Sequence, residues 1–355
     1  MGLRSRVERA AALSFLRLPP SVLRRIVGAP VRSAEGYELD LQGQALNFLM
    51  KLTRQPELHE RGPLGGRPLL DHSGRLLDLP DLDDVTVADL TVPGAEGPRA
   101  ARVYRPAGAP RDRAPGMVFF HGGGFVLGSI ESHDGVCRAL AKLSGVVVVS
   151  VDYRLAPEHR FPAGLHDAIA ATRWVLANAA TIGIDPTHVA VGGDSAGGNL
   201  AALVGLELRG DAVKPVFELL IYPATDLSRS LPSHRAFAEG FMLPEKSVTF
   251  FRENYLPDMK LETDPRASPY FAKDLQSAPP ALVVTAGFDP LRDEGKAYAD
   301  HLRAAGVEVE YVCSEGSQHG FANTAGGIAE SARMLRLMAD RLRRATAHVR
   351  VASAA

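Results

Sequence analysis

A pentapeptide of sequence Gly-Asp-Ser-Ala-Gly occupies residues 193–197 and has the pattern of a serine nucleophile. An apolar run, residues 188–192, precedes it and a helical pattern, residues 196–208, follows it. This strand–turn–helix context is the one that a nucleophile elbow requires. Glycine on both sides permits a turn too sharp for other residues and leaves the serine hydroxyl exposed above the sheet. The pattern therefore predicts Ser195 as a nucleophile.

A second glycine-rich stretch, His-Gly-Gly-Gly-Phe at residues 121–125, follows the apolar run 117–120. Acyl transfer places negative charge on a carbonyl oxygen, and backbone N–H groups in a glycine loop can come close enough to stabilise it. Together with the N–H of Ala196, such a loop would form an oxyanion hole. A phosphate-binding loop is the competing interpretation. It fails because Leu127 stands where G-x-G-x-x-G needs its third glycine, and no G-K-[ST] follows.

A serine nucleophile needs a base and a carboxylate that orients the base, in the chain order serine, acid, histidine for this type of elbow. Asp289 directly follows one apolar run, and His319 lies in a glycine-flanked loop after the next. Both positions fall at carboxyl ends of expected strands, on the side where Ser195 is displayed. Asp293 and Glu294 compete with Asp289, but acids at their position commonly support a helix N-terminus. We therefore expect Asp289 to be the orienting carboxylate.

Other histidines offer no competing metal chemistry. His133, His159 and His166 share no metal-ligand spacing, and the H-E-x-x-H pattern is absent.

Short apolar runs alternate with helical patterns from residue 85 onward. Runs 85–91 and 99–104 are joined by Pro-Gly and Gly-Pro pairs and predict a β-hairpin. Later runs are continuous and too short for buried helices, as expected of parallel strands covered on both faces. These runs comprise residues 117–120, 146–151, 188–192, 217–222, 281–286 and 307–312, with helical patterns at 166–180, 196–208, 291–305 and 329–344. The alternation predicts an α/β fold with a doubly wound sheet.

Two segments break this alternation. Residues 1–55 are helix-like without a strand pattern, and residues 226–265 hold clustered aromatic residues between prolines. Segments inserted into a doubly wound sheet often lie over its carboxyl edge, where ligands bind. Peripheral helices with no role in binding remain the alternative.

Composition and charge exclude several classes of protein. The 355 residues are 46% hydrophobic and 23% charged, which is typical of a globular protein and not of a disordered or disulfide-scaffold one. A net charge of -1 argues against a surface built for nucleic acid. Residues 1–32 hold seven arginines and residues 331–355 hold six, with one acidic residue in each, which leaves 27 basic and 39 acidic residues between them. A solvated basic face is preferred over a membrane patch for these ends.

Cysteine usage and hydropathy favour a cytoplasmic protein. Cys137 and Cys313 are far apart and form no CxxC motif, which suits a reducing compartment. No apolar run approaches the roughly 18 residues that a membrane span needs. The N-terminal apolar run, residues 10–16, is short, is ended by Arg17 and lacks a cleavage site, so an amphipathic helix is preferred over a signal peptide.

With these motifs in place, the sequence resembles the bacterial hormone-sensitive-lipase-like esterases, known as family IV of the α/β-hydrolase superfamily. The resemblance runs in order from about residue 117 to residue 321 and rests on five stretches. They are residues 121–125, the Asp-Tyr-Arg-Leu-Ala-Pro-Glu stretch at 152–158, residues 193–199, the Asp-Pro-Leu-Arg-Asp-Glu-Gly stretch at 289–295, and His-Gly-Phe at 319–321.

The resemblance implies a carboxylester hydrolase for short-to-medium acyl esters, without a cofactor or a metal. Ser195 would be the nucleophile, His319 the base and Asp289 its orienter. The oxyanion donors would be the backbone of Gly123, Gly124 and Ala196, with His121 and Gly122 shaping the loop. The 152–158 stretch would have a structural role only.

The resemblance also implies an α/β-hydrolase fold whose helical cap comes from two parts of the chain. The cap would comprise residues 1–55 and 226–265, and the core residues 56–225 and 266–355. Residues 56–84 are longer than the family pattern demands. Candidate pocket walls are Phe125 of the oxyanion loop and cap residues Phe15, Leu16, Phe48, Leu49, Phe237, Phe241 and Met242. Each of the cap residues has cap core as its alternative role.

Three questions stay open in the sequence. Amide or formamide hydrolysis uses the same residue types on the same scaffold, and a non-catalytic ligand-binding module would keep the pocket without the chemistry. The expected partners are a small-molecule ester and water, without nucleic acid or membrane. A homodimer through the last strand and final helix is an analogy with relatives only.

Overall fold

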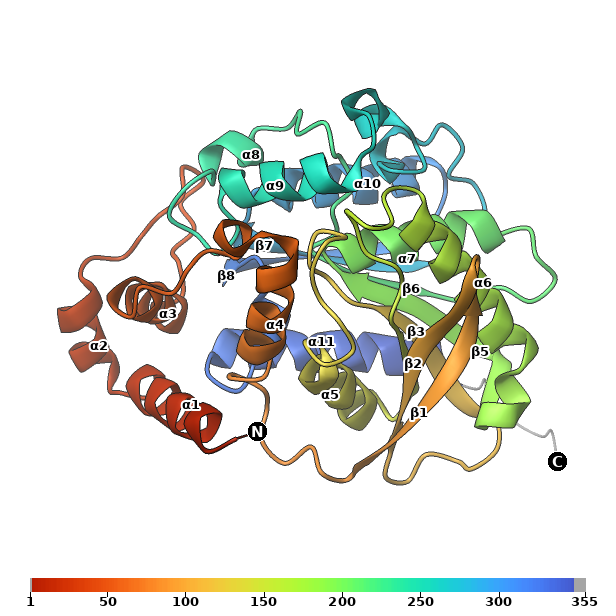
Figure 1. Ribbon diagram of the computed structural model, residues 1–355, viewed down its shortest axis with the longest axis horizontal. Helices are drawn as coiled ribbons and strands as arrows, with labels where there is room; N and C mark the ends of the chain where they lie inside the picture. Colours follow the sequence, from red (N-terminus) through yellow and green to blue (C-terminus); the bar gives the residue numbers. More distant parts are fainter. Residues whose placement is uncertain (1, 348–355) are drawn as a thin grey trace, which may run out of the picture.

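Eight strands form one sheet in the order β1-β2-β4-β3-β5-β6-β7-β8 in the computed structural model, which describes residues 2–347 (Figure 1). Strand β2 is antiparallel to both β1 and β4, and the pairs from β4 to β8 are all parallel. The strands are β1 (Val85–Gly94), β2 (Gly97–Pro106), β3 (Ala114–Phe120), β4 (Val147–Val151), β5 (Ile184–Asp194), β6 (Glu218–Ile221), β7 (Ala281–Phe288) and β8 (Val309–Gln318).

The parallel strands are the apolar runs of the sequence. Strands β4, β6 and β7 are buried along their whole length, because helices cover both faces of the sheet. The predicted hairpin is confirmed by the pairing of β1 with β2, which turns at Gly97 with a φ of +91°. The predicted doubly wound α/β sheet is therefore confirmed.

Helices of the core divide between the two faces. One face is covered by α5 (Asp134–Ser144) and α11 (Ala329–Ala345), which bury Leu140 and Met338 in a shared cluster with β6 and β7. The other is covered by α6 (Ala163–Ala177), α7 (Ala196–Leu208) and α10 (Arg292–Ala304). The 3-10 turns of the core are η2 (Ala179–Ile182), η4 (Pro269–Phe271) and η5 (Phe321–Thr324).

The two segments that break the alternation are helical, as the sequence predicts. The N-terminal one contains α1 (Leu3–Leu16), α2 (Pro20–Val27) and α3 (Leu41–Leu52), and it continues through η1 (Leu58–Arg61) and α4 (Gly62–Gly74). The inserted one contains α8 (Ser233–Ala236), α9 (Glu245–Tyr255) and η3 (Met259–Thr263). Figure 1 shows α4 and α9 near each other at one edge of the sheet, and a 3.0 Å contact between His59 Nδ1 and Ser247 Oγ joins the two segments.

Some arginines of the two basic ends form hydrogen bonds or ion pairs within the molecule. Arg9 donates to three backbone carbonyls around α4 and β1, and Arg24 and Arg32 both meet Glu38. On α11, Arg343 and Arg344 pair with Asp340. The final basic residue of the sequence lies at position 350, outside the described residues. Between residues 2 and 347, no helix is both long and apolar enough to cross a membrane.

Candidate active site

Ser195 lies at the turn between β5 and α7, in a backbone conformation with φ +55° and ψ -117° that is costly for a serine. Close backbone approaches explain the flanking glycines. A Cβ at Gly197 would collide with the carbonyl of Phe120, and one at Gly193 would collide with the backbone of Gly197. The turn brings β3, β5 and α7 into contact through their backbones, and it leaves the Ser195 side chain at the wall of a cavity.

Asp289 and His319 meet because the last residues of two neighbouring strands pair in register. Phe288 at the end of β7 lies opposite Gln318 at the end of β8. Asp289 therefore directly follows β7, and His319 directly follows β8. Nδ1 of His319 lies 2.8 Å from Oδ2 of Asp289. On its other side, Nε2 of His319 lies 3.0 Å from Oγ of Ser195. Hydroxyl, imidazole and carboxylate form one continuous chain of contacts.

The competing acid, Asp293, has different partners. Its carboxylate accepts from the backbone N–H of Ser233 at 2.9 Å and from Nε of Arg292 at 2.9 Å. Asp289 is fully buried, and its second oxygen accepts from the N–H of Leu291 at 2.8 Å. Both oxygens of Asp289 are thereby fixed, so the carboxylate that faces His319 has one orientation.

Three backbone N–H groups lie free beside Ser195. Within residues 2–347, the N–H groups of Gly123, Gly124 and Ala196 make no hydrogen bond. All three residues line the same cavity as Ser195 and His319. Gly123 and Gly124 have φ of +117° and +61°, which favours glycine, and a Cβ at Gly124 would collide with the ring of Phe251. Ala196 is the first residue of α7, so its N–H has no acceptor inside the helix.

The glycine-rich loop at residues 121–125 is anchored by Asp194, to which the sequence assigned no role. Oδ1 of Asp194 accepts from the N–H of Gly122 at 2.8 Å and lies 3.1 Å from Nε2 of His133. Burial by itself raises the pKa of Asp194, but His133 and the Gly122 N–H outweigh burial and hold that pKa below its ordinary value. The charged carboxylate therefore ties the loop to the residue that directly precedes Ser195. The signal for this role was its place inside the Gly-Asp-Ser-Ala-Gly pentapeptide.

The 152–158 stretch supports the same loop. The hydroxyl of Tyr153 donates to the carbonyl of His121 at 2.8 Å, and the two rings stack with centroids 4.5 Å apart. Arg154 forms a buried pair with Asp167 at 2.8 Å. The Tyr153 contacts hold the loop on the side away from the cavity, and none of these residues lines the cavity.

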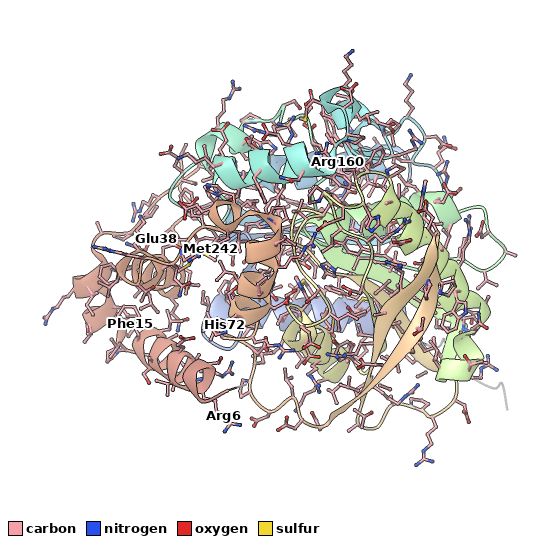
Figure 2. The ribbon with its side chains drawn as sticks, in the orientation of Figure 1. Arg6, Phe15, Glu38, His72, Arg160 and Met242 are labelled. Carbon is pink, nitrogen blue, oxygen red and sulfur yellow. The ribbon has the colours of Figure 1, made fainter. Side chains whose placement is uncertain are left out.

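The cavity in front of Ser195 has a volume of about 1770 Å³ and is bounded by both helical segments. Its lining residues include Phe125, Phe241, Leu49 and Met242, as expected for pocket walls. Of these four, Met242 is labelled in Figure 2. Phe237 is not among the lining residues. It is 3% exposed and packs against Leu39, Phe241 and Phe288, so it lies where the two helical segments meet the end of β7. The other candidates outside the lining are Phe15, Leu16 and Phe48.

Comparison with known proteins identifies relatives of this arrangement. The profile of a family described as alpha/beta hydrolase fold matches residues 117–323. The carboxylic ester hydrolase LipN of Mycobacterium tuberculosis is 44% identical over 247 residues, which span 67% of this chain and 65% of LipN. Esterase LipI of the same organism is 43% identical over 260 residues, which span 72% of this chain and 81% of LipI.

A solved structure agrees with these relatives. An ester hydrolase from the metagenome of Lake Arreo, complexed with a derivative of bipyridine phosphonate, is 41% identical. It superposes with a TM-score of 0.81 over 85% of this chain and 97% of its own. The resemblance identified from the motifs is confirmed, and the chain belongs to the hormone-sensitive-lipase-like family IV of the α/β-hydrolase superfamily.

Proposed function

We propose that this protein is a carboxylester hydrolase that acts through Ser195, His319 and Asp289. The observation that carries the proposal is the chain of contacts from Ser195 Oγ through His319 to Asp289, at 3.0 and 2.8 Å, beside three free backbone N–H groups. A nucleophile, a base, an orienting carboxylate and an oxyanion hole are the parts that acyl transfer from an ester requires.

The first half-reaction begins when Oγ of Ser195 attacks the ester carbonyl carbon. Nε2 of His319 accepts the hydroxyl proton, while Nδ1–H of the same ring donates to Asp289, which stabilises the imidazolium. The carbonyl oxygen becomes an oxyanion, for which the N–H groups of Gly123, Gly124 and Ala196 are the donors. The bond to the alkoxy group then breaks, and His319 gives its proton to the leaving alcohol.

The second half-reaction returns the enzyme to its starting state. Nε2 of His319 takes a proton from water, whose oxygen attacks the acyl carbon of the acyl-enzyme. The same N–H groups hold the second oxyanion, which collapses with cleavage of the bond to Ser195 Oγ. His319 reprotonates the serine, and the carboxylic acid leaves. The proposed chemistry uses the three side chains, the backbone N–H donors and water.

The cap gives the cavity its walls and thereby selects the substrate. In this proposal the cap consists of residues 1–55 and 226–265, and η1 and α4 from the adjoining 56–225 segment extend it. Apolar walls such as Phe125, Leu49 and Met242 suit the acyl group of a short-to-medium acyl ester. The names of relatives support this substrate class, since one is an ethyl acetate hydrolase of Pseudomonas putida that is 38% identical.

Ser195→Ala and His319→Ala, assayed on p-nitrophenyl butyrate, test the proposal. We expect both variants to fold and to retain only residual catalysis, on the order of 10³–10⁴ over the reaction in water, from the remaining binding and oxyanion contacts. Turnover by either folded variant at the rate of the wild type would rule out this mechanism.

A further inference from the structure

Helix α3 of the cap contacts the strand that carries the base through a reciprocal pair of amide side chains. Nδ2 of Asn47 donates to Oε1 of Gln318 at 2.8 Å, and Nε2 of Gln318 donates to Oδ1 of Asn47 at 3.2 Å. Gln318 is 5% exposed, so this amide is withdrawn from water on the core side. Each amide thus satisfies the other, and each has both a donor and an acceptor committed to the pair.

This contact lies at the end of the strand that leads into His319. Gln318 is the final residue of β8, pairs in register with Phe288, and is followed directly by His319. The start of α3 approaches the same strand end. The N–H of Asp40 donates to the carbonyl of Gly316 at 2.9 Å, and Nε2 of Gln318 reaches the carbonyl of Gly43 at 3.4 Å.

We propose that Asn47 and Gln318 are positioning residues through which the cap holds His319 in line with Ser195 and Asp289. The inference rests on the proposed function, since it concerns the base of that reaction. The ring of His319 contacts Asp289 through Nδ1, Ser195 through Nε2 and the ring of Tyr222, and its backbone is followed by Gly320 with φ +77°. The amide pair fixes the residue before it, so loss of the pair frees the loop that carries the ring.

The pair also couples the substrate-binding cavity to the chemistry. Asn47 and His319 both line the cavity, so an acyl group packed against α3 contacts the residue that holds the base in place. A wall residue without this coupling would affect only the binding of long acyl groups. Positioning of His319 affects turnover of every ester.

This difference defines the experiment. Asn47→Ala, Gln318→Ala and their double variant are assayed on p-nitrophenyl acetate and on p-nitrophenyl octanoate. We expect each single variant to lower kcat about tenfold on both esters, with KM within about twofold of the wild type, because the base is misplaced in every case. The double variant should be no slower than the slower single variant, since the two residues act as one unit.

Three further variants control for folding and for a general effect of the cap. Gln44→Ala removes a buried amide from the same helix, but this amide donates to the carbonyls of Val27 and Ala29 and does not reach the triad loops. We expect it to leave kcat unchanged. The exchanged pair Asn47→Gln with Gln318→Asn should recover most of the lost kcat. Asn47→Asp keeps the shape of the side chain and replaces its NH2 donor by a carboxylate oxygen that only accepts, so it replaces Asn47→Ala if the latter does not fold.

Unchanged kcat in folded Asn47→Ala and Gln318→Ala, or losses that multiply in the double variant, would overturn the inference. A substrate-independent readout separates this failure from that of the proposed function. The downfield NMR signal of the proton on Nδ1 of His319 should shift or broaden in Asn47→Ala and stay unchanged in Gln44→Ala. An unchanged signal in Asn47→Ala overturns the positioning role, whereas turnover by Ser195→Ala overturns the proposed function alone.

Discussion

Ser195 combines an unfavourable backbone conformation with a short distance from its hydroxyl to the imidazole of His319, and its glycine neighbours make the combination possible. At φ +55° the turn is strained for a serine, and the surrounding backbone must hold it. The carbonyl of Phe120 and the backbone of Gly197 lie so close that neither Gly193 nor Gly197 tolerates a Cβ. The two glycines of the elbow are therefore required by close packing between backbones.

Gly197→Ala tests this packing. The added methyl meets a backbone carbonyl that cannot move aside cheaply, so we expect a loss of about 1–3 kcal/mol in the free energy of unfolding, together with a large loss of kcat. Denaturant unfolding and steady-state kinetics measure the two effects. Gly210→Ala is the matched control, because a Cβ there would meet no atom within 4 Å. Equal stability of the two variants would contradict the argument.

Single residues were predictable where a local motif or strand order marks them. Ser195 stands in a pentapeptide, and Asp289 and His319 follow apolar runs at the same edge of the sheet. Contacts between distant positions carried no such mark. Asn47 meets Gln318 across 271 positions, and polar residues of this kind occur at many positions of any sequence.

At the level of elements, the hydrophobic pattern of the sequence predicts the central strands better than the edge strand β8. The sequence predicts a strand over residues 307–312, whereas β8 runs from Val309 to Gln318. Its second half is polar although Ser314, Ser317 and Gln318 are buried, because these side chains form hydrogen bonds, and a register shift after Ala286 interrupts the pairing of the strand. A polar, irregular strand end has no apolar run to reveal it.

The sequence does not predict helix α4, for a different reason. Its sequence contains four glycines and two prolines, which disfavour a helix by intrinsic propensity. Two of the glycines are required by packing, since a Cβ at Gly66 would press on Leu127 and one at Gly74 would collide with the carbonyl of Ser132. Tertiary packing against Leu127 and Ser132 thus outweighs the local preference.

Helix α8 of the inserted segment is held to the loop of Asp289 by a buried pair. Nε2 of His234 lies 2.6 Å from Glu294, and Ser233 Oγ donates to the carbonyl of Pro290 at 2.6 Å. Burial raises the pKa of Glu294, and His234 offsets this only in part. The pair is therefore a stabilising contact only as long as both members are present.

His234→Ala should destabilise the protein by about 3 kcal/mol, because it leaves the carboxylate of Glu294 buried without its side-chain partner. Thermal unfolding measures this loss, and limited proteolysis should show earlier cleavage within residues 226–265. His234→Gln retains a donor and should recover part of the stability. Arg235→Ala, on the exposed side of the same helix, is the control. A stability of His234→Ala equal to that of this control would show that the pair contributes nothing.

At the level of the whole molecule, the N-terminal segment is fastened to the core near Asp78, between α4 and β1. Nη2 of Arg9 donates to the carbonyl of Asp78 at 2.7 Å, and a Cβ at Gly135 would collide with the Asp78 carboxyl group. Burial raises the pKa of Asp78 to about 7, Arg9 opposes this shift, and Asp134 adds to it. The junction between the N-terminal helical segment and the sheet therefore contains a carboxyl group whose pKa is well above its ordinary value.

This pKa predicts how stability depends on pH. The ordinary pKa is 3.8, so between about pH 4 and pH 7 the folded state binds more protons than the unfolded state. The contribution of Asp78 to the free energy of unfolding is highest below pH 4 and falls as the pH rises to 7. Asp78→Asn removes this fall, so we expect its Tm relative to the wild type to increase from pH 5 to pH 8. Asp83→Asn, at an exposed position nearby, is the control, and parallel Tm curves for wild type and Asp78→Asn would refute the assignment.

The central claim is that Ser195 forms a covalent bond to the acyl group, and labelling with a fluorophosphonate tests it most directly. Attack by Oγ on phosphorus displaces fluoride and leaves a phosphonyl group on the serine, in a reaction that needs His319 and the oxyanion donors. Intact mass spectrometry should show one phosphonyl group on the wild type, and peptide mapping should place it on Ser195. Ser195→Ala should remain unlabelled. A label at another residue, or labelling of Ser195→Ala at the wild-type rate, would contradict the account.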